Sequence, residues 1–217
     1  GKVITDSEGT PFPGLYAAGE CACVSVHGAN RLGCNSLLDT LVFGRRAGKE
    51  MRRYIHTVGF SPLPANPEKE VADKISALME SNGNEKGGPI REELQEVMMD
   101  KVSVFRQRSG LIEALEKVRE LKGRYQKIAI QDKGSCFNRD LLDAIELDYM
   151  LDLAEVITLG ALAREESRGA HSREDFPDRD DQNWLVHTMF RYSKEEGPQV
   201  FFKPVTITRF QPKERKY

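Results

Sequence analysis

Several features that define other protein classes are scarce in this chain of 217 residues. Its formal net charge is only −2, which gives no support for binding nucleic acid or an anionic membrane surface. No apolar run reaches the roughly 18 residues that cross a bilayer, so we expect membrane contact only through partner subunits. A hydrophobic fraction of 39% beside 30% charged residues is typical of a globular protein with a buried core.

Cysteine and histidine are also scarce, with four of each. The cysteines are Cys21, Cys23, Cys34 and Cys136, which are too few and too irregularly spaced for a disulfide framework. The pair Cys21-Ala-Cys23 suggests metal ligands, but zinc and iron–sulfur sites usually have two or more residues between paired ligands and a second such pair. We therefore expect reduced thiols and no metal site.

The first pattern that indicates a ligand is Gly14-Leu-Tyr-Ala-Ala-Gly-Glu20. Residues 15–18 predict a short buried strand, and Gly19 would let the backbone pass close to a ligand. Glu20 then lies at the carboxyl end of that strand, where an acidic side chain can accept hydrogen bonds from ribose hydroxyls. The alternative is that the Gly-Glu pair only turns the chain.

A polar loop and a helix follow, in the run His27-Gly-Ala-Asn-Arg-Leu-Gly-Cys-Asn-Ser-Leu-Leu-Asp39. Asn35 and Ser36 are candidate caps for a helix over about residues 36–56. Its amino end would favour an electron-rich group, and Arg31 carries a rigid fork suited to a carboxylate. A solvated surface salt bridge is the alternative role for Arg31.

These two segments closely resemble the flavoprotein subunit of succinate dehydrogenase and its fumarate reductase relatives. A second match lies downstream, in Arg164-Glu-Glu-Ser-Arg-Gly-Ala-His-Ser-Arg-Glu-Asp-Phe-Pro-Asp-Arg-Asp-Asp181, then Trp184 and His187. The closing Arg215-Lys-Tyr217 is also similar to the end of that subunit. The resemblance covers essentially the whole chain.

The resemblance implies roles for individual residues. Glu20 would hydrogen-bond the FAD, Arg31 would bind a carboxylate of succinate or fumarate, and Ser36 and Leu37 would contact the flavin. Cys34 stands where the family usually has glycine, alanine or serine, so we expect a tolerated small residue and not a redox thiol. No residue of this chain is assigned as catalytic.

The resemblance also implies features that this chain does not contain. A Gly-x-Gly-x-x-Gly phosphate loop, the histidine that usually tethers the flavin, and the capping domain with its proton-transferring Arg are all lacking. We therefore expect a C-terminal fragment of a longer subunit, inactive alone and with FAD absent or weakly bound.

For the intact enzyme the resemblance implies hydride transfer from succinate to FAD, giving fumarate, with electrons passing to an iron–sulfur subunit and on to quinone. It would be peripheral, on the cytoplasmic face of a bacterial inner membrane or on the mitochondrial matrix side. Two alternatives remain open. One is an L-aspartate oxidase-type flavoenzyme, and the other is a non-catalytic helical module that binds a partner subunit or an assembly factor.

The remaining sequence predicts mainly helices. A proline-rich stretch at 60–67 interrupts the pattern, and helices are expected at about 68–81, 90–105, 111–121 and 139–166, with an exposed mobile loop at 83–89. In the last of these helices the apolar set Leu142, Ile145, Tyr149, Leu153 and Val156 is expected to face the core.

Two features follow the last of these helices. The charged segment 165–181 is either a solvated loop or a fixed ion network between domains. Residues 184–191 and 200–209 predict a terminal antiparallel strand pair, with Gly197-Pro198 in the connection.

The predicted fold class is therefore α+β and mainly helical. Residues 1–58 would be the C-terminal edge of an α/β FAD-binding domain, residues 59–67 a linker, residues 68–182 an antiparallel helical bundle, and residues 183–217 a terminal β segment and tail. The edge strand and apolar area of residues 1–58 predict association or disorder there.

Overall fold

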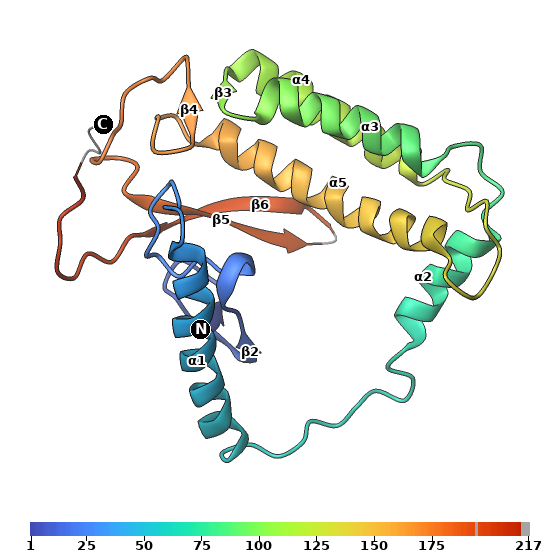
Figure 1. Ribbon diagram of the computed structural model, residues 1–217, viewed down its shortest axis with the longest axis horizontal. Coiled ribbons are helices and arrows are strands. Elements are labelled where there is room, and N and C mark those ends of the chain that lie inside the picture. The colour runs from blue at the N-terminus through green and yellow to red at the C-terminus, as the bar shows by residue number, and fades with distance from the viewer. Residues whose placement is uncertain (194, 214–217) are drawn as a thin grey trace. The chain divides into compact units, whose positions relative to one another are not determined.

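The computed structural model describes residues 1–193 and 195–213, so the C-terminal Arg215–Tyr217 lies outside the described residues. The chain forms two compact units: unit 1 is Gly1–Val58 with Asp178–Tyr217, and unit 2 is Gly59–Pro177. Helices dominate and the sheets are small (Figure 1), which confirms the predicted α+β, mainly helical class. Among the described residues, no helix combines the length and apolar character that a bilayer crossing requires.

Unit 1 contains one long helix and two small antiparallel sheets. Its elements are β1 (Lys2–Ile4), β2 (Pro11–Tyr16), the 3-10 turn η1 (Gly19–Cys21), α1 (Asn35–Ile55), β5 (Val186–Ser193) and β6 (Gly197–Pro204). Strand β1 pairs with β2, and β5 pairs with β6. Both ends of the chain therefore contribute to this unit.

Strand β2 is less buried than the sequence predicted. It ends at Tyr16, and Leu15 is 48% exposed. Within the described residues β2 pairs with β1 alone, so its outer edge and one face have no cover from neighbouring strands. The expectation of a buried strand over residues 15–18 was therefore wrong.

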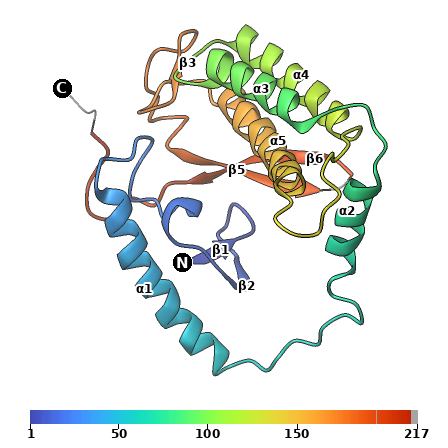
Figure 2. The same cartoon turned by 45° about the vertical axis from the view of Figure 1, so that its right-hand side comes forward.

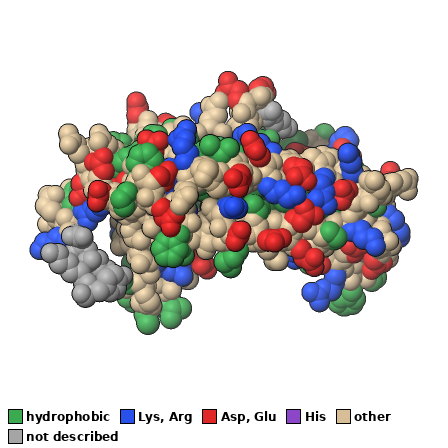
Figure 3. Space-filling view, turned by 90° about the horizontal axis from the view of Figure 1, so that it is seen from above, with side chains coloured by type: hydrophobic (Ala, Val, Ile, Leu, Met, Phe, Trp, Pro, Cys, Tyr) green, Lys and Arg blue, Asp and Glu red, His purple; other side chains and the backbone are tan. Residues whose placement is uncertain are grey.

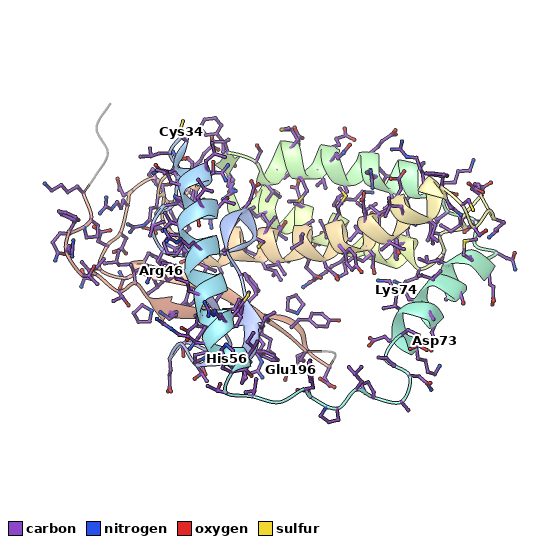
Figure 4. All side chains as sticks on the ribbon, turned by 60° about the horizontal axis from the view of Figure 1, so that its bottom comes forward. Cys34, Arg46, His56, Asp73, Lys74 and Glu196 are labelled. Carbon is purple, nitrogen blue, oxygen red and sulfur yellow. The ribbon has the colours of Figure 1, made fainter. Side chains whose placement is uncertain are left out.

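Helix α1 begins at Asn35, as expected, but it is not capped in the expected way. The N-cap residue is Cys34, its φ of 66° lies in the left-handed region, and no side chain caps the helix. Asn35 and Ser36 are therefore helical residues and not caps. Figure 4 shows Cys34 at the start of α1, Arg46 midway and His56 at its end.

The terminal antiparallel pair is confirmed. Strands β5 and β6 are in register from Val186 opposite Pro204 to Ser193 opposite Gly197. Gly197 has a φ of 71°, so it turns the chain, but with Pro198 it begins β6 and is not part of the connection. Trp184 packs edge-on against Phe202, with ring centroids 5.4 Å apart.

Unit 2 is a helical bundle. Its elements are α2 (Lys69–Glu80), α3 (Gly87–Val97), the π-helical turn η2 (Met98–Val102), β3 (Phe105–Arg106), α4 (Arg108–Tyr125), α5 (Arg139–Ala163) and β4 (Ser172–Arg173). Figures 1 and 2 show α3 and α4 lying along α5. Helices α4 and α5 are antiparallel, because Arg119 pairs with Glu155 whereas Tyr125, further along α4, donates to the carbonyl of Ala144.

The core of unit 2 lies only in part on the face of α5 that the sequence predicted, since Ile145 of the expected set packs against it. Its buried members from the helices and the 128–130 segment are Leu78, Ile90, Leu94, Val118, Leu121, Tyr125, Ile128, Ile130, Ala144, Leu147, Leu151 and Ala154. Leu142, Tyr149 and Leu153, which were expected in the core, are 54%, 56% and 61% exposed. Helix α5 is apolar on two sides, so periodicity alone could not identify the packed side.

The expected mobile loop at 83–89 is instead held in place. The N–H of Glu85 donates to the carbonyl of Lys127 at 3.1 Å, and the N–H of Ala129 donates to the carbonyl of Glu85 at 3.0 Å. Gly83 lies so close to Lys127 that a Cβ there would be 1.8 Å from its carbonyl oxygen. Residues 87–89 already belong to α3, which leaves only a short connection.

The charged segment after α5 forms a fixed ion network within unit 2. Glu166 is fully buried between Arg164 and Arg168. Arg173 is also fully buried; it forms a bidentate pair with Asp175, and its Nη1 donates to the carbonyls of Ala161, Leu162 and Arg164 at the end of α5. This arrangement satisfies helix-terminal carbonyls that have no partner within the helix.

Asp175 and His171 are among the titratable groups of this network whose pKa values are shifted. The guanidinium of Arg173 lowers the pKa of Asp175 to about 2. Burial lowers the pKa of His171, and the nearby charges of Arg106, Arg164 and Arg173 add to this effect. His171 is therefore a neutral imidazole that accepts from Arg106 at Nδ1 (2.5 Å) and donates to the carbonyl of Arg164 from Nε2 (3.1 Å).

Candidate functional site

The candidate site lies in unit 1, where η1, the loop 27–34 and the start of α1 come together. Gly19 is buried with a φ of 79°, and a Cβ at this position would lie 3.2 Å from Thr40 Oγ1 on α1. The close approach that the sequence predicted at Gly19 is therefore an approach to helix α1. It holds η1, which carries Glu20, against the first turns of that helix.

The structure brings Glu20 and Arg31 together. Nη1 of Arg31 lies 3.5 Å from Oε1 of Glu20, and the two side chains are 45% and 88% exposed. An ion pair this exposed contributes little to stability, so both charged groups remain available to a ligand. Arg31 thus forms the surface ion pair that was the alternative prediction for it. Its partner is Glu20, the other charged residue that the sequence predicted to bind a ligand.

Ser36 and Leu37 lie on the first turn of α1. The Ser36 side chain is half-buried and its carbonyl accepts from Thr40 Oγ1 at 3.0 Å, whereas Leu37 is 70% exposed. No side chain caps this end of the helix. The N–H groups of Asn35 and Leu37 donate to the carbonyls of Leu32 and Cys34, whereas the positive end of the helix dipole has no side-chain cap.

The residues of this site fit a flavin nucleotide. An exposed carboxylate at Glu20 suits hydroxyl groups, the uncapped start of α1 suits electron-rich atoms, and exposed Leu37 suits an apolar ring surface. In residues 1–193 and 195–213, no cluster of His, Cys, Asp and Glu side chains is arranged to hold a metal ion.

Reasoning from the sequence missed one pair of residues at this site. Nε2 of His27 lies 2.8 Å from Oδ2 of Asp39, and these side chains are 18% and 5% exposed. A signal was present in the sequence, because Asp39 is an acidic residue within the apolar run Leu37, Leu38, Leu41 and Val42. A carboxylate in such a run is buried only with a partner.

A second polar contact joins the segment before this loop to strand β5. Oγ of Ser25 lies 3.0 Å from Nε2 of His187, and Sγ of Cys23 lies 3.9 Å from its Nδ1. Ser25 has a φ of 63°, which is uncommon for a residue other than glycine. Sequence reasoning assigned no contact to these residues, since they are 162 positions apart.

Comparison with known proteins identifies the family. The family model described as fumarate reductase flavoprotein C-term matches residues 91–217, and the one described as FAD binding domain matches residues 1–37. The fumarate reductase flavoprotein subunit of Haemophilus influenzae is 40% identical over 210 residues, covering 96% of this chain and 35% of that protein. The succinate dehydrogenase flavoprotein subunit of Rickettsia bellii is 42% identical over 203 residues, covering 90% and 33%.

Solved structures agree with these relatives. A quinol fumarate reductase of E. coli superposes with a TM-score of 0.86 at 37% identity, covering 93% of this chain and 35% of that one. The Sdh1 complex of Mycobacterium smegmatis in its apo form gives 0.83 at 33%, covering 92% and 34%. An adenylylsulfate reductase from Archaeoglobus fulgidus, at 21% identity, shares the fold alone.

The chain thus spans about a third of the length of the curated relatives that it matches. The C-terminal family model covers more than half of this chain, and the FAD-binding model covers the segment that contains the candidate site. The chain therefore belongs to the succinate dehydrogenase and fumarate reductase flavoprotein family, whose members are FAD-dependent oxidoreductases.

Proposed function

We propose that this chain is part of a flavoprotein subunit that oxidises succinate to fumarate, and that Arg31 binds a carboxylate of the substrate. The observation that carries this proposal is the exposed Arg31 fork, 3.5 Å from Glu20 and next to the uncapped start of α1. A guanidinium binds a carboxylate through two parallel N–H···O hydrogen bonds, which fix the orientation of the substrate as well as its position.

We further propose that Glu20, Ser36 and Leu37 hold the FAD. Glu20 would accept hydrogen bonds from hydroxyl groups, the positive end of the α1 dipole would face an electron-rich edge, and Leu37 would cover apolar ring surface. When bound, the flavin supplies the two-electron redox chemistry. This chain supplies binding and orientation, and no proton-transferring residue is assigned to it.

Electrons would leave through an iron–sulfur subunit and reach quinone, and a membrane would be met only through such partners. The subunit would lie on the cytoplasmic face of a bacterial inner membrane or on the matrix side of a mitochondrial one. The names of the relatives include both succinate dehydrogenase and fumarate reductase subunits. Rates in both directions on the intact subunit would decide which direction dominates.

The test compares Arg31→Gln with the parent in the intact, FAD-containing subunit. We expect kcat/KM for succinate to fall by about 100-fold or more, because a charge-assisted bidentate contact is lost, while bound FAD stays unchanged. The matched control is Arg53→Gln on α1, because Arg53 is 79% exposed and pairs only with Glu50 among the described residues. Its kinetics should equal those of the parent.

Two results would contradict the proposal. An unchanged kcat/KM in Arg31→Gln would remove Arg31 from substrate binding. A parent subunit that oxidises L-aspartate faster than succinate would instead support the L-aspartate oxidase alternative. The flavin content of Glu20→Gln, read from the visible absorbance of the purified subunit, tests the cofactor assignment separately.

A further inference from the structure

The buried pair of His27 and Asp39 joins the start of the loop 27–34, which carries Arg31, to helix α1. His27 is the first residue of that loop, and Asp39 lies on the second turn of α1. Their side chains meet at 2.8 Å and are 18% and 5% exposed. This contact therefore holds the first residue of the loop against helix α1.

Backbone bonds tie only the end of the loop to α1, because the N–H of Asn35 donates to the carbonyl of Leu32 at 3.3 Å and the N–H of Leu37 donates to the carbonyl of Cys34 at 3.2 Å. Gly28 has a φ of 62°, and a Cβ at Gly28 or Gly33 would meet no atom within 4 Å, so no neighbouring segment packs closely on these two residues. Of the described side-chain contacts of this loop, the other is the exposed one between Arg31 and Glu20 at 3.5 Å. Among the described residues, the pair of His27 and Asp39 is therefore the one buried side-chain contact that ties this loop to α1.

The chemistry of the pair is directional. A carboxylate oxygen accepts, so Nε2 of His27 donates to Oδ2 of Asp39. Nδ1 of His27 and Oδ1 of Asp39 are buried and have no hydrogen-bond partner among the described residues. With its other oxygen unsatisfied, the buried Asp39 carboxylate depends on the hydrogen bond from His27.

We propose that His27 and Asp39 are a positioning pair that fixes Arg31 for carboxylate binding. This inference rests on the proposed role of Arg31. The pair does not touch the substrate; it sets where the Arg31 fork stands, and a displacement of about 1 Å at such a group can cost about 100-fold in rate.

The experiment measures dicarboxylate binding to the intact, FAD-containing subunit by calorimetry. The probe is malonate, whose single methylene leaves no carbon–carbon bond to desaturate, so binding is read without turnover. His27→Phe keeps the ring but removes the donor, and we expect the malonate dissociation constant to rise at least fivefold. His27→Gln keeps an N–H in place of Nε2, and we expect a rise of less than fivefold.

Three further variants make the result specific. Asp39→Asn keeps an acceptor oxygen and should resemble His27→Gln. Glu50→Gln, which removes an ion pair with Lys2 three turns further along α1, should leave malonate binding unchanged. If His27→Phe does not yield folded subunit, His27→Asn, whose side chain is too short to reach Asp39, gives the same comparison.

The outcomes separate this inference from the proposed function. Unchanged malonate binding in Arg31→Gln contradicts the proposed function. Weakened binding in Arg31→Gln, with a change of less than fivefold in His27→Phe, contradicts only the positioning role. Steady-state kinetics give a second reading, because a purely structural role would lower the yield of FAD-containing subunit but leave KM for succinate unchanged in the subunit that folds.

Discussion

Cys34 occupies a backbone conformation that glycine adopts far more readily than cysteine. Its φ of 66° at the N-cap of α1 places the Cβ in a strained position, which costs about 1–2 kcal/mol. Replacement by glycine removes that strain and costs about 0.5–1 kcal/mol of added chain entropy in the unfolded state. We expect Cys34→Gly to raise the free energy of unfolding by about 0.5–1 kcal/mol, measured by urea denaturation.

The matched control for this substitution is Cys21→Gly. Cys21 ends η1 and is not among the residues of positive φ, so glycine there relieves no strain; it adds the entropy cost and removes the contact of the thiol with the Ala18 carbonyl at 3.4 Å. That variant should lose about 0.5–1 kcal/mol. Equal losses in both variants would show that the conformation of Cys34 is not strained.

His171 links the stability of unit 2 to pH. Its pKa is lowered from 6.5 in the folded state, so the unfolded chain binds more protons than the folded one in the window just below pH 6.5. The contribution of this residue is therefore complete above pH 6.5 and is lost as the pH falls through the lowered pKa. We expect a smaller free energy of unfolding at pH 5.5 than at pH 7.5.

The control is His171→Gln, which keeps a polar side chain that does not titrate. The difference in unfolding free energy between the two pH values should be smaller in this variant than in the parent. Asp175 does not interfere, because its pKa of about 2 lies well below this range. An identical pH dependence in both proteins would assign the effect to other groups.

Helix α5 offers two neighbouring leucines with opposite environments. Leu151 is fully buried in the core of unit 2, whereas Leu153 is 61% exposed. We expect Leu151→Ala to lower the free energy of unfolding by about 2–5 kcal/mol and Leu153→Ala by less than about 1 kcal/mol. The two variants differ only in the position of the same substitution, so each is the control for the other. Equal losses of unfolding free energy would show that both faces of α5 are packed.

Local patterns predicted the helices but not the contacts between distant segments. Helix α1 was expected at 36–56 and spans Asn35–Ile55, since its apolar spacing is clear along the chain. The backbone bonds between Glu85 and residues 127–129 join segments about forty positions apart. No local signal marks such a pairing, so the segment was expected to be mobile.

The same distinction holds at the candidate site. Glu20 and Arg31 were singled out from their motifs, and the structure brings them together. The His27 and Asp39 pair was missed because burial of one charged residue on α1 depends on how the preceding loop folds back. The sequence therefore predicted the two residues that we propose a ligand contacts, but not the buried pair of His27 and Asp39.

For the whole molecule, apolar surface on α1 predicts self-association of the 217-residue chain. Leu37, Leu38 and Leu41 lie in one stretch of this helix and are 70%, 59% and 71% exposed. Exposed apolar patches of this kind associate in water. We expect the purified chain to have an average mass above its monomer value of 24.5 kDa in light scattering.

A double variant tests the origin of that association. Leu38→Lys with Leu41→Lys should shift the average mass toward that of the monomer, while Val71→Lys, at an isolated exposed position on α2, should not. Acidic and basic side chains are interspersed on the face in Figure 3. Association through apolar contacts should therefore persist in 0.5 M salt, and dissociation by salt would point to ion pairs instead.

The two-part composition of unit 1 has a consequence for synthesis on the ribosome. Residues 1–58 emerge first, but the hairpin of β5 and β6 that completes this unit emerges only after all of unit 2. Contacts such as that between Ser25 and His187 must wait until then, whereas the bundle can fold while translation continues. Within this chain, the segment with Glu20 and Arg31 thus completes its contacts with β5 only after all of unit 2 has been synthesised.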